Sequence, residues 1–249
     1  MRFSDCSDVG QVRRINQDSL CREVLDEAAE IALVAVADGM GGYQAGEVAS
    51  QLAIARVRTE VVGHWREWGS ADRVLDGLRA AVETANAAIL AAQADPEQAG
   101  MGTTLTAALV EGDTIFLAHA GDSRGYLVKP EDVRQITDDH SVVGELVRSG
   151  SLTEAEAMNH PQRHLLTSAL GSPAGIQVDA VAVGWAPGDT LVLCTDGLTN
   201  LVNRDEVAQA ILRSEPFEAV APALVALANA RGGPDNITVV ACRRDGVAP

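Results

Sequence analysis

The sequence predicts an α+β sandwich, in which two mostly antiparallel β-sheets pack together and a pair of helices flanks each outer face. Helical patterns occur near residues 45–94 and again near 203–230, with about nine strand patterns along the chain. The turns between residues 101 and 128 are too short for crossover helices, which indicates antiparallel pairing. We expect residues 1–249, of which 47% are hydrophobic, to form a single domain.

The first part of the chain contains the most informative strand. Residues 8–18 are polar and irregular and lead into a short strand near 20–24. Residues 31–37 are an unbroken apolar run, as expected for a strand buried on both faces, and the run ends at Asp38. Glycines 39, 41 and 42 allow the backbone to pass close to whatever this carboxylate binds. The alternative is a tight turn with a solvated aspartate.

Two helices are expected next. In the first, residues 45–62, apolar residues recur at helical spacing. They are Val48, Leu52, Ala55 and Val62. The second spans about 70–94, with Ser70 as a candidate N-cap and Pro96 just beyond its end.

The pattern then changes to strands. Residues 101–110 and 114–120 form a predicted hairpin around Gly112, and residues 125–128 form a third strand after a turn. Residues 138–175 combine loops with two short helices, the first at 142–147, and are expected to form a flap over the surface.

The last third returns to strands and then to helices. Strands are predicted at 177–183, 190–195 and 237–242. Capping-box patterns begin two helices: Thr153 with Glu156 inside the flap, and Asn203 with Glu206 before a helix that ends near residue 213. A further helix is expected at 217–230.

Composition excludes several classes of function. The net charge is −16, which argues against nucleic acid or an anionic membrane as a partner, since both require basic patches. The four cysteines have no zinc-binding spacing, and Cys194 and Cys242 lie in apolar runs typical of buried thiols. This cysteine usage favours a reduced, cytoplasmic protein. No apolar run approaches the roughly 18 residues of a membrane span, so we expect the protein to be unanchored, and we also expect a monomer.

Aspartates at strand ends are the strongest chemical signal. They are Asp18, Asp38, Asp122, Asp196 and Asp235. If these carboxylates converge they repel one another unless a cation compensates, and oxygen ligands without matching His or Cys favour Mg²⁺ or Mn²⁺. Two such ions about 3.5–4 Å apart are typical of phosphoester hydrolysis. Spacing alone leaves the convergence open.

Other phosphate chemistries lack their motifs. No cysteine precedes an arginine at the C-x₅-R spacing, and no D-x-D supports an aspartyl-phosphate route. The only lysine, Lys129, precedes Pro130, so the chain has no P-loop.

Seven short motifs occur in the order and rough spacing of one family. They are Arg13-Arg-Ile-Asn-Gln-Asp18, Asp38-Gly-Met-Gly-Gly42, Gly102-Thr-Thr104, Gly121-Asp-Ser-Arg124, Asp139-His-Ser141, Thr195-Asp-Gly197 and Asp235-Asn-Ile-Thr238. Each motif is weak by itself, but together they are specific. Over nearly its whole length the chain resembles the bacterial metal-dependent protein serine/threonine phosphatases of type 2C.

The resemblance implies a β-sandwich flanked by helix pairs, with a binuclear Mn²⁺/Mg²⁺ site at one end. It implies hydrolysis of phosphoserine and phosphothreonine in proteins by a metal-activated water, without a phosphoenzyme intermediate. A serine/threonine kinase and its substrates are the partners that such an activity implies.

The same resemblance assigns metal ligands. Asp38 would bridge the two core ions, and the Gly39 carbonyl would bind one of them. Asp196 and Asp235 would complete the set. Asp122 matches an acid that holds a third, weaker ion together with the equivalent of Asp196, the alternative being an ordinary turn residue.

Further positions match residues around the metals. Asp18 would contact the ions through water, and Arg13 would grip the substrate phosphate with its planar fork. Arg14 is expected to lie at the surface, and Arg163 is expected to bind phosphopeptide. Asn236 would order the Asp235 loop, with structural and catalytic roles left open.

The chain also departs from the family pattern. Methionine at position 40 replaces a histidine thought to protonate the leaving group in many eukaryotic members, so water or a residue such as His160 must act instead, and we favour water. Gln17 replaces a common glutamate. His119 is expected to be structural, whereas His140 and His160 border the flap.

Two functions therefore remain: an active phosphatase, or an inactive family member that serves as a metal- or phosphoprotein-binding regulatory module. The complete set of Asp38, Asp196 and Asp235 favours the enzyme. The acidic surface further suggests substrates with basic flanks.

Overall fold

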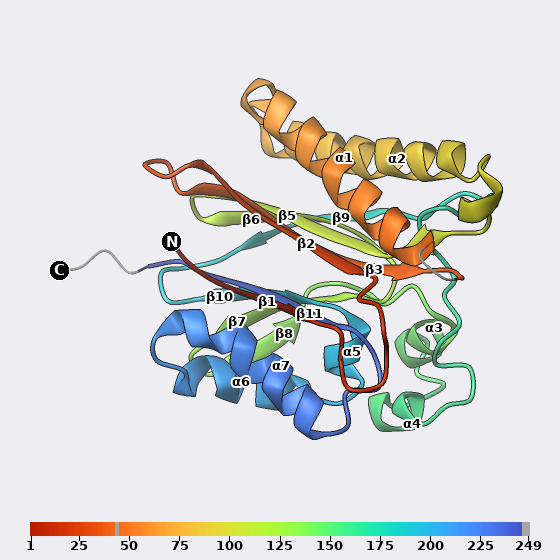
Figure 1. The fold of residues 1–249 in the computed structure, drawn as a ribbon. Coiled ribbons are helices and arrows are strands. Elements are labelled where there is room, and N and C mark those ends of the chain that lie inside the picture. The colour runs from red at the N-terminus through yellow and green to blue at the C-terminus, as the bar shows by residue number, and fades with distance from the viewer. Residues whose placement is uncertain (43–44, 246–249) are drawn as a thin grey trace.

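Two antiparallel β-sheets packed face to face form the centre of the computed structural model, which describes residues 1–42 and 45–245 (Figure 1). One sheet has the strand order β2-β3-β5-β6-β9, with β4 paired to β3, and the other has the order β1-β11-β10-β7-β8. The strands are β1 (Arg2–Asp8), β2 (Asp18–Asp26), β3 (Ile31–Met40), β4 (Gly102–Thr103), β5 (Leu105–Glu111), β6 (Thr114–Ala120), β7 (Arg124–Lys129), β8 (Asp132–Gln135), β9 (Asp179–Gly184), β10 (Thr190–Cys194) and β11 (Ile237–Arg243).

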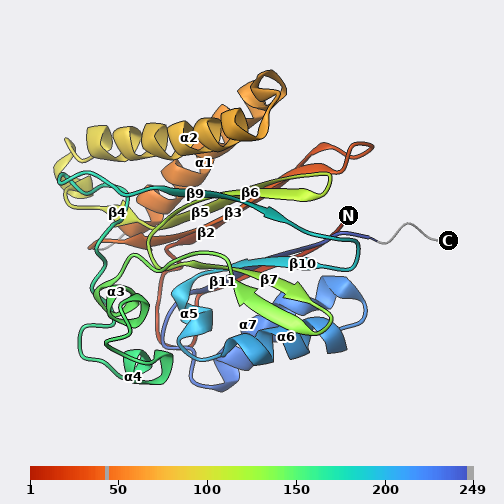
Figure 2. The ribbon, with the colours of Figure 1, turned by 180° about the vertical axis from the view of Figure 1, so that it is seen from behind.

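Helix pairs cover both outer faces, which confirms the predicted α+β sandwich. Helices α1 (Ala45–Trp68) and α2 (Ala71–Ala92) lie on the sheet that contains β3, and α6 (Arg204–Arg213) and α7 (Val220–Ala230) lie on the other (Figures 1 and 2). The remaining helices are α3 (Val142–Arg148), α4 (Glu154–Met158), α5 (Asp196–Thr199) and the 3₁₀ turns Pro96–Gln98 and Phe217–Ala219.

Strand β3 is buried on both faces, as predicted from its apolar run. Leu33 and Ala35 pack in the layer with α1 and α2, whereas Val34 and Val36 point into the layer between the sheets. Successive side chains of a strand alternate in direction, so a strand between two apolar layers needs apolar residues at every position.

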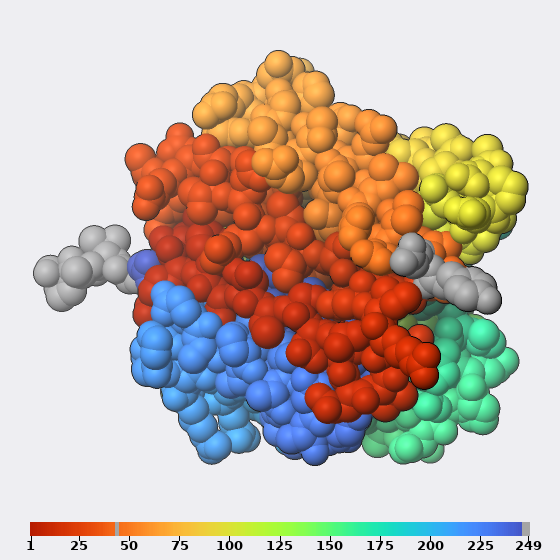
Figure 3. Space-filling model, in the orientation of Figure 1, coloured from red at the N-terminus to blue at the C-terminus, as the bar shows by residue number. Residues whose placement is uncertain are grey.

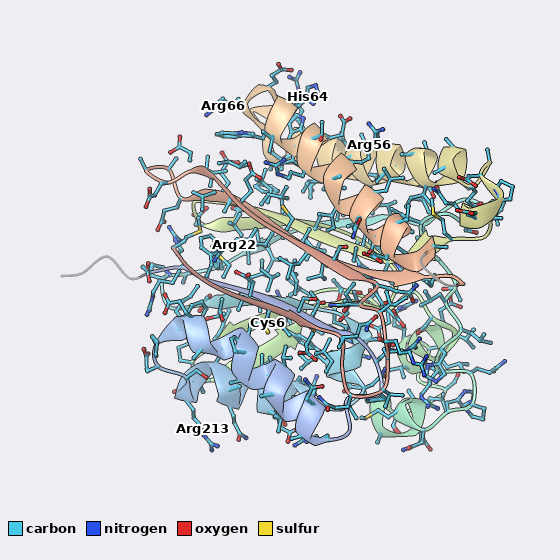
Figure 4. All side chains as sticks on the ribbon, in the orientation of Figure 1. Cys6, Arg22, Arg56, His64, Arg66 and Arg213 are labelled. Atoms are coloured by element: carbon cyan, nitrogen blue, oxygen red, sulfur yellow. The ribbon has the colours of Figure 1, made fainter. Side chains whose placement is uncertain are left out.

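The buried stripe of α1 differs from the prediction. The expected stripe was Val48, Leu52, Ala55 and Val62, but the fully buried stripe is Ala49, Ala53, Val57 and Val61. The small alanines allow close approach to the sheet. Val48 and Leu52 are partly buried against the same core, whereas Ala55 and Val62 are exposed. Arg56 and His64 point outward from this helix (Figure 4).

The segment at about 138–175, predicted to form a flap, contains both helices predicted for it. Ser141 caps α3 by accepting a hydrogen bond from the Gly144 backbone, and Thr153 and Glu156 form the expected capping box of α4. Asn203 and Glu206 form the second capping box, at the start of α6.

Two strands, one α-helix and the 3₁₀ turn Pro96–Gln98 were not predicted. Strand β1 is mostly polar, with Phe3 and Cys6 as its only apolar residues, β8 has four residues, and α5 is one turn. Such short or mixed segments carry little periodic signal. The described residues thus contain eleven strands rather than about nine. Ser70 lies at the N-cap of α2 as expected, but its side chain makes no capping hydrogen bond.

Further contacts bind the sandwich together. Arg22 of β2 forms an ion pair with Asp5 of β1 and so links the two sheets (Figure 4). Cys194 and Cys242 are fully buried, and burial raises the pKa of each thiol to about 12. Among the described helices, none is long and apolar enough to cross a membrane.

Candidate metal centre

The strand-end aspartates all lie at one rim of the sandwich, beside the flap. In one sheet Asp18 begins β2 directly opposite Asp38, near the end of the antiparallel strand β3. In the other sheet the end of β10, which precedes Asp196, pairs with the start of β11, which follows Asp235. The flap helices α3 and α4 stand next to this rim (Figure 2). Antiparallel pairing therefore brings together residues that are far apart in the sequence.

Asp38 is surrounded by the other carboxylates. Burial raises its pKa well above the ordinary value, and the charges of Asp18, Asp196, Asp122 and Asp235 raise it further. Its backbone is fixed because its carbonyl accepts hydrogen bonds from the Thr104 N–H and the Thr103 hydroxyl. Like charges this close are unfavourable unless a proton or a cation compensates them.

Asp18 is the most enclosed of these acids. Burial raises its pKa to about 7, against hydrogen bonds from Thr238 and Thr195 that lower it. The Thr195 hydroxyl donates to Oδ2 at 2.8 Å, whereas Oδ1 is buried without a hydrogen-bond partner. A buried acceptor without a partner costs about 1–3 kcal/mol, so Oδ1 is suited to bind a ligand or water. Thr195 belongs to the Thr195-Asp-Gly197 motif, but the sequence pattern gave this hydroxyl no role of its own.

Asp122, in the turn between β6 and β7, and Asp196, after β10, interact electrostatically. Asp196 is the first residue of α5, and the Asn200 side chain donates to its Oδ2 at 3.0 Å. Burial and the charge of Asp235 raise the pKa of Asp196. Burial followed by the charge of Asp196 raises the pKa of Asp122 well above its ordinary value.

Asp235 lies closest to a positive charge. Arg13 Nη2 donates to its Oδ2 at 2.9 Å across more than two hundred residues of sequence. The Arg13 side chain is 51% exposed, so it can exchange this partner for another anion. Arg14 is exposed, as expected. The N-terminal segment that contains them forms part of the face shown in red between the helices (Figure 3).

Asn236 fixes the loop at residues 9–17 that carries Arg13. Its Nδ2 donates to the carbonyls of Val9 and Ile15, at 2.9 and 3.0 Å, and its Oδ1 accepts from the Gln17 N–H. Asn236 thus has a clear structural role. It orders the 9–17 loop in addition to the Asp235 loop that was expected.

Gly39 permits a very close backbone contact. A Cβ at this position would lie 2.0 Å from the Gly46 carbonyl oxygen and 2.5 Å from that of Gln17. The strand that carries Asp38 can therefore approach both α1 and the 9–17 loop only because residue 39 has no side chain.

The histidines occupy different places. His119 is fully buried, with a hydrogen-bond partner on each ring nitrogen. The contacts of His160 lie within the flap, where its Nδ1 accepts from the Gln162 N–H. His164, which no sequence pattern singles out, lowers the pKa of Asp196 through its charge. A lone histidine between loop residues offers no sequence signal for this proximity.

A cavity of about 460 Å³ opens from the aspartates toward the flap. Asp122 and Asp196 line one part of it, and Arg163 is an exposed residue of the flap lining. Arg148 and Arg204 line it as well, and neither was singled out from the sequence. The cavity therefore offers both oxygen ligands and guanidinium groups for an anionic ligand.

The donor set fits hard divalent cations. Within residues 1–42 and 45–245, no three acidic, histidine or cysteine side chains already form a compact metal-binding group. The carboxylates nevertheless raise one another's pKa, and several take a neighbouring donor instead, such as Thr195 for Asp18 and Asn200 for Asp196. Small rotations of carboxylates around a cation would satisfy these charges and the unpaired Asp18 oxygen.

The comparisons with known proteins agree with this geometry. The family model described as "Protein phosphatase 2C" matches residues 11–230. The serine/threonine phosphatase Stp of Listeria monocytogenes is 38% identical over 243 residues, covering 96% of this chain and 94% of that protein.

Solved structures show the same likeness. The Streptococcus agalactiae serine/threonine phosphatase has a TM-score of 0.90 and 34% identity, covering 98% of this chain and 99% of that one. The catalytic domain of PstP, in complex with 2 manganese ions, has a TM-score of 0.83 and 39% identity, covering 98% of each chain. In its sequence, its sandwich fold and its rim of aspartates, this chain belongs to the protein phosphatase 2C family.

Proposed function

We propose that this protein hydrolyses phosphoserine and phosphothreonine in other proteins with the help of Mn²⁺ or Mg²⁺. The observation that carries the proposal is the rim at which partly buried aspartates, positioned by both sheets, raise one another's pKa. Oxygen-only ligands of this kind suit hard cations. Family membership and the manganese complex of the PstP domain support the same activity.

Specific residues are assigned to the ions. Asp38, the Gly39 carbonyl, Asp196 and Asp235 would hold two core ions, and Asp122 with Asp196 a third, weaker one. Asp18, whose Oδ1 has no hydrogen-bond partner, would contact them through water. When bound, the ions would stabilise phosphoryl charge and supply a nucleophilic water at neutral pH.

Arginines would bind the substrate. Arg13 would exchange Asp235 for the substrate phosphate and bind it through two guanidinium N–H groups. The loop that carries Arg13 is pre-organised because Asn236 binds the carbonyls of Val9 and Ile15. Arg163 would contact phosphopeptide in the cavity beside the flap. Met40 packs near Gly102 and cannot donate a proton, so we assign protonation of the leaving group to water.

The biological setting is proposed as well. Residues 1–249 would form one catalytic domain, with the flap at about 138–175, that works as a cytoplasmic monomer. Its substrates would be phosphorylated proteins, among them a serine/threonine kinase and the targets of that kinase. The acidic composition, which disfavours nucleic acid and anionic membranes, supports this setting.

Hydrolysis of para-nitrophenyl phosphate and of a phosphothreonine peptide, with and without Mn²⁺, tests the function. We expect turnover that a chelator removes and that Asp38→Ala and Asp196→Ala abolish. A matched control is Asp132→Asn, at an exposed position of β8. A well-folded protein without Mn²⁺-dependent turnover would instead support the regulatory module.

A further inference from the structure

A buried histidine connects the flap to the turn that carries Asp122. His140 is 2% exposed, and its Nε2 lies 3.0 Å from Oδ2 of Asp179 at the start of β9. Its Nδ1 accepts a hydrogen bond from the Gly121 N–H at 3.2 Å. Because Nδ1 is an acceptor, the ring proton must be on Nε2, where it is donated to the carboxylate. We call these contacts of Asp179, His140 and Gly121 the His140 link.

The backbone strengthens the same connection. The His140 N–H donates to the Gly121 carbonyl at 2.7 Å, and the His140 carbonyl accepts from the Thr167 N–H at 2.8 Å. Both backbone groups of Gly121 are therefore bound to one residue. Gly121 has a φ of +119°, and a Cβ there would lie 2.6 Å from the Thr104 side chain, so the turn has little freedom to adjust.

Asp122 is the next residue in this turn. Asp122 and Asp196 line the same cavity, and burial followed by the charge of Asp196 raises the pKa of Asp122, so the two carboxylates are close enough to interact. Unlike Asp38, which is near the end of a long buried strand, Asp122 lies in a turn outside the strands. Its direction therefore depends on what holds Gly121.

We propose that the His140 link holds Asp122 in place beside Asp196 at the cavity and thereby sets the affinity of the weakest cation site. The proposal rests on the proposed function, because it concerns the third ion that these two aspartates would share. His140 is a positioning residue in this scheme and does not touch substrate. Residues that orient a metal ligand commonly change metal affinity 10- to 100-fold when they are altered.

Variants can separate the parts of the link. Asp179→Ala removes the acceptor that fixes the imidazole. His140→Gln keeps a donor toward Asp179 but loses the acceptor for Gly121, whereas His140→Asn keeps an oxygen near the Gly121 N–H. Asp132→Asn is the control, because it removes one aspartate charge at an exposed site on β8.

The measurement is Mn²⁺ binding to the full chain, by calorimetry and by electron paramagnetic resonance of free Mn²⁺, with thermal unfolding recorded for each variant. We expect Asp179→Ala and His140→Gln to weaken only the weakest site, by about 10-fold. His140→Asn should restore most of the affinity, and Asp132→Asn should bind as the wild type does.

Other outcomes would overturn the proposal. If the wild-type chain binds only two Mn²⁺ ions, there is no third site and the proposal is wrong. If Asp179→Ala and His140→Gln lose affinity equally at all sites, the His140 link has a merely structural role. Unchanged binding in Asp179→Ala and His140→Gln would contradict it directly. The readout here is Mn²⁺ binding and not activity. A wild-type protein that binds Mn²⁺ without hydrolysing phosphopeptide would refute the proposed function, but the binding of the variants would still test the role of the His140 link.

Discussion

Charge compensation dominates the candidate site at the scale of single residues. Asp18, Asp196 and Asp235 each have a polar partner, and Asp38 lies among all of them. Burial and mutual repulsion favour the neutral, protonated form of these carboxyl groups, whereas binding of a divalent cation requires the charged form. The residues that would make the site functional are therefore a cost to the fold in the absence of an ion.

This cost can be measured by neutralising one acid. Asp38→Asn keeps the shape of the side chain but removes its charge, so with a chelator present we expect unfolding about 2–4 °C above that of the wild type. Added Mn²⁺ should stabilise the wild type and not the variant. Differential scanning calorimetry at pH 7.5 provides both values, and a lower midpoint of the variant in chelator would contradict the argument.

The two neighbouring arginines permit a matched comparison. Arg13→Ala should lower kcat/KM for a phosphothreonine peptide by roughly 10- to 100-fold, because hydrogen bonds to a charged group contribute about 1.5–3 kcal/mol. Arg14→Ala, which removes an exposed arginine one residue away, should change it less than about twofold. Steady-state kinetics tests this, and similar losses in both variants would show that Arg13 has no special role.

At the scale of elements, β3 positions the site through its close contacts. Its apolar residues fill two layers, and its end passes α1 at a distance that only glycine allows. Capping boxes define where α4 and α6 begin, independently of the site. The position of Asp38 therefore depends on this backbone packing as well as on the hydrogen bonds from Thr103 and Thr104.

Two glycines of the same segment test this dependence. Gly39→Ala places a Cβ 2.0 Å from the Gly46 oxygen, and such overpacking costs about 1–3 kcal/mol and displaces Asp38. Gly42→Ala meets no atom within 4 Å and should be neutral. Thermal unfolding and Mn²⁺ titration distinguish them, and wild-type Mn²⁺ affinity in Gly39→Ala would exclude this role of the glycine.

At the scale of the whole molecule, the sandwich buries polar groups that make its stability depend on pH. Burial, and to a smaller extent the charge of His140, lower the pKa of His119 from 6.5 to about 4. The unfolded chain therefore binds a proton before the folded chain does. The stability contributed by neutral His119 is complete above about pH 6.5 and is lost as the pH falls toward 4.

We expect this difference to remove about 2–3 kcal/mol of unfolding free energy between pH 7 and 4.5. Urea unfolding of His119→Gln at both pH values should show a loss that is smaller by that amount. His64→Gln, at a 54% exposed position, is the control and should lose stability as the wild type does. Equal losses in all three proteins would rule out His119 as the cause.

Local sequence patterns predicted much of this molecule. The buried strand before Asp38, the hairpin at Gly112 and the capping box at Asn203 each depend on residues within a few positions of one another. The ordered motifs indicated the family, which the comparisons confirm. Patterns of this kind survive in the sequence because propensity and periodicity are local.

The tertiary structure alone decided how distant residues meet. It set which stripe of α1 is buried, paired Arg13 with Asp235, and joined His140 to Asp179 at the flap. Sequence spacing could suggest that the aspartates converge but could not establish it. Such contacts depend on how two sheets register and pack, and that arrangement minimises the free energy of the whole chain rather than of any segment.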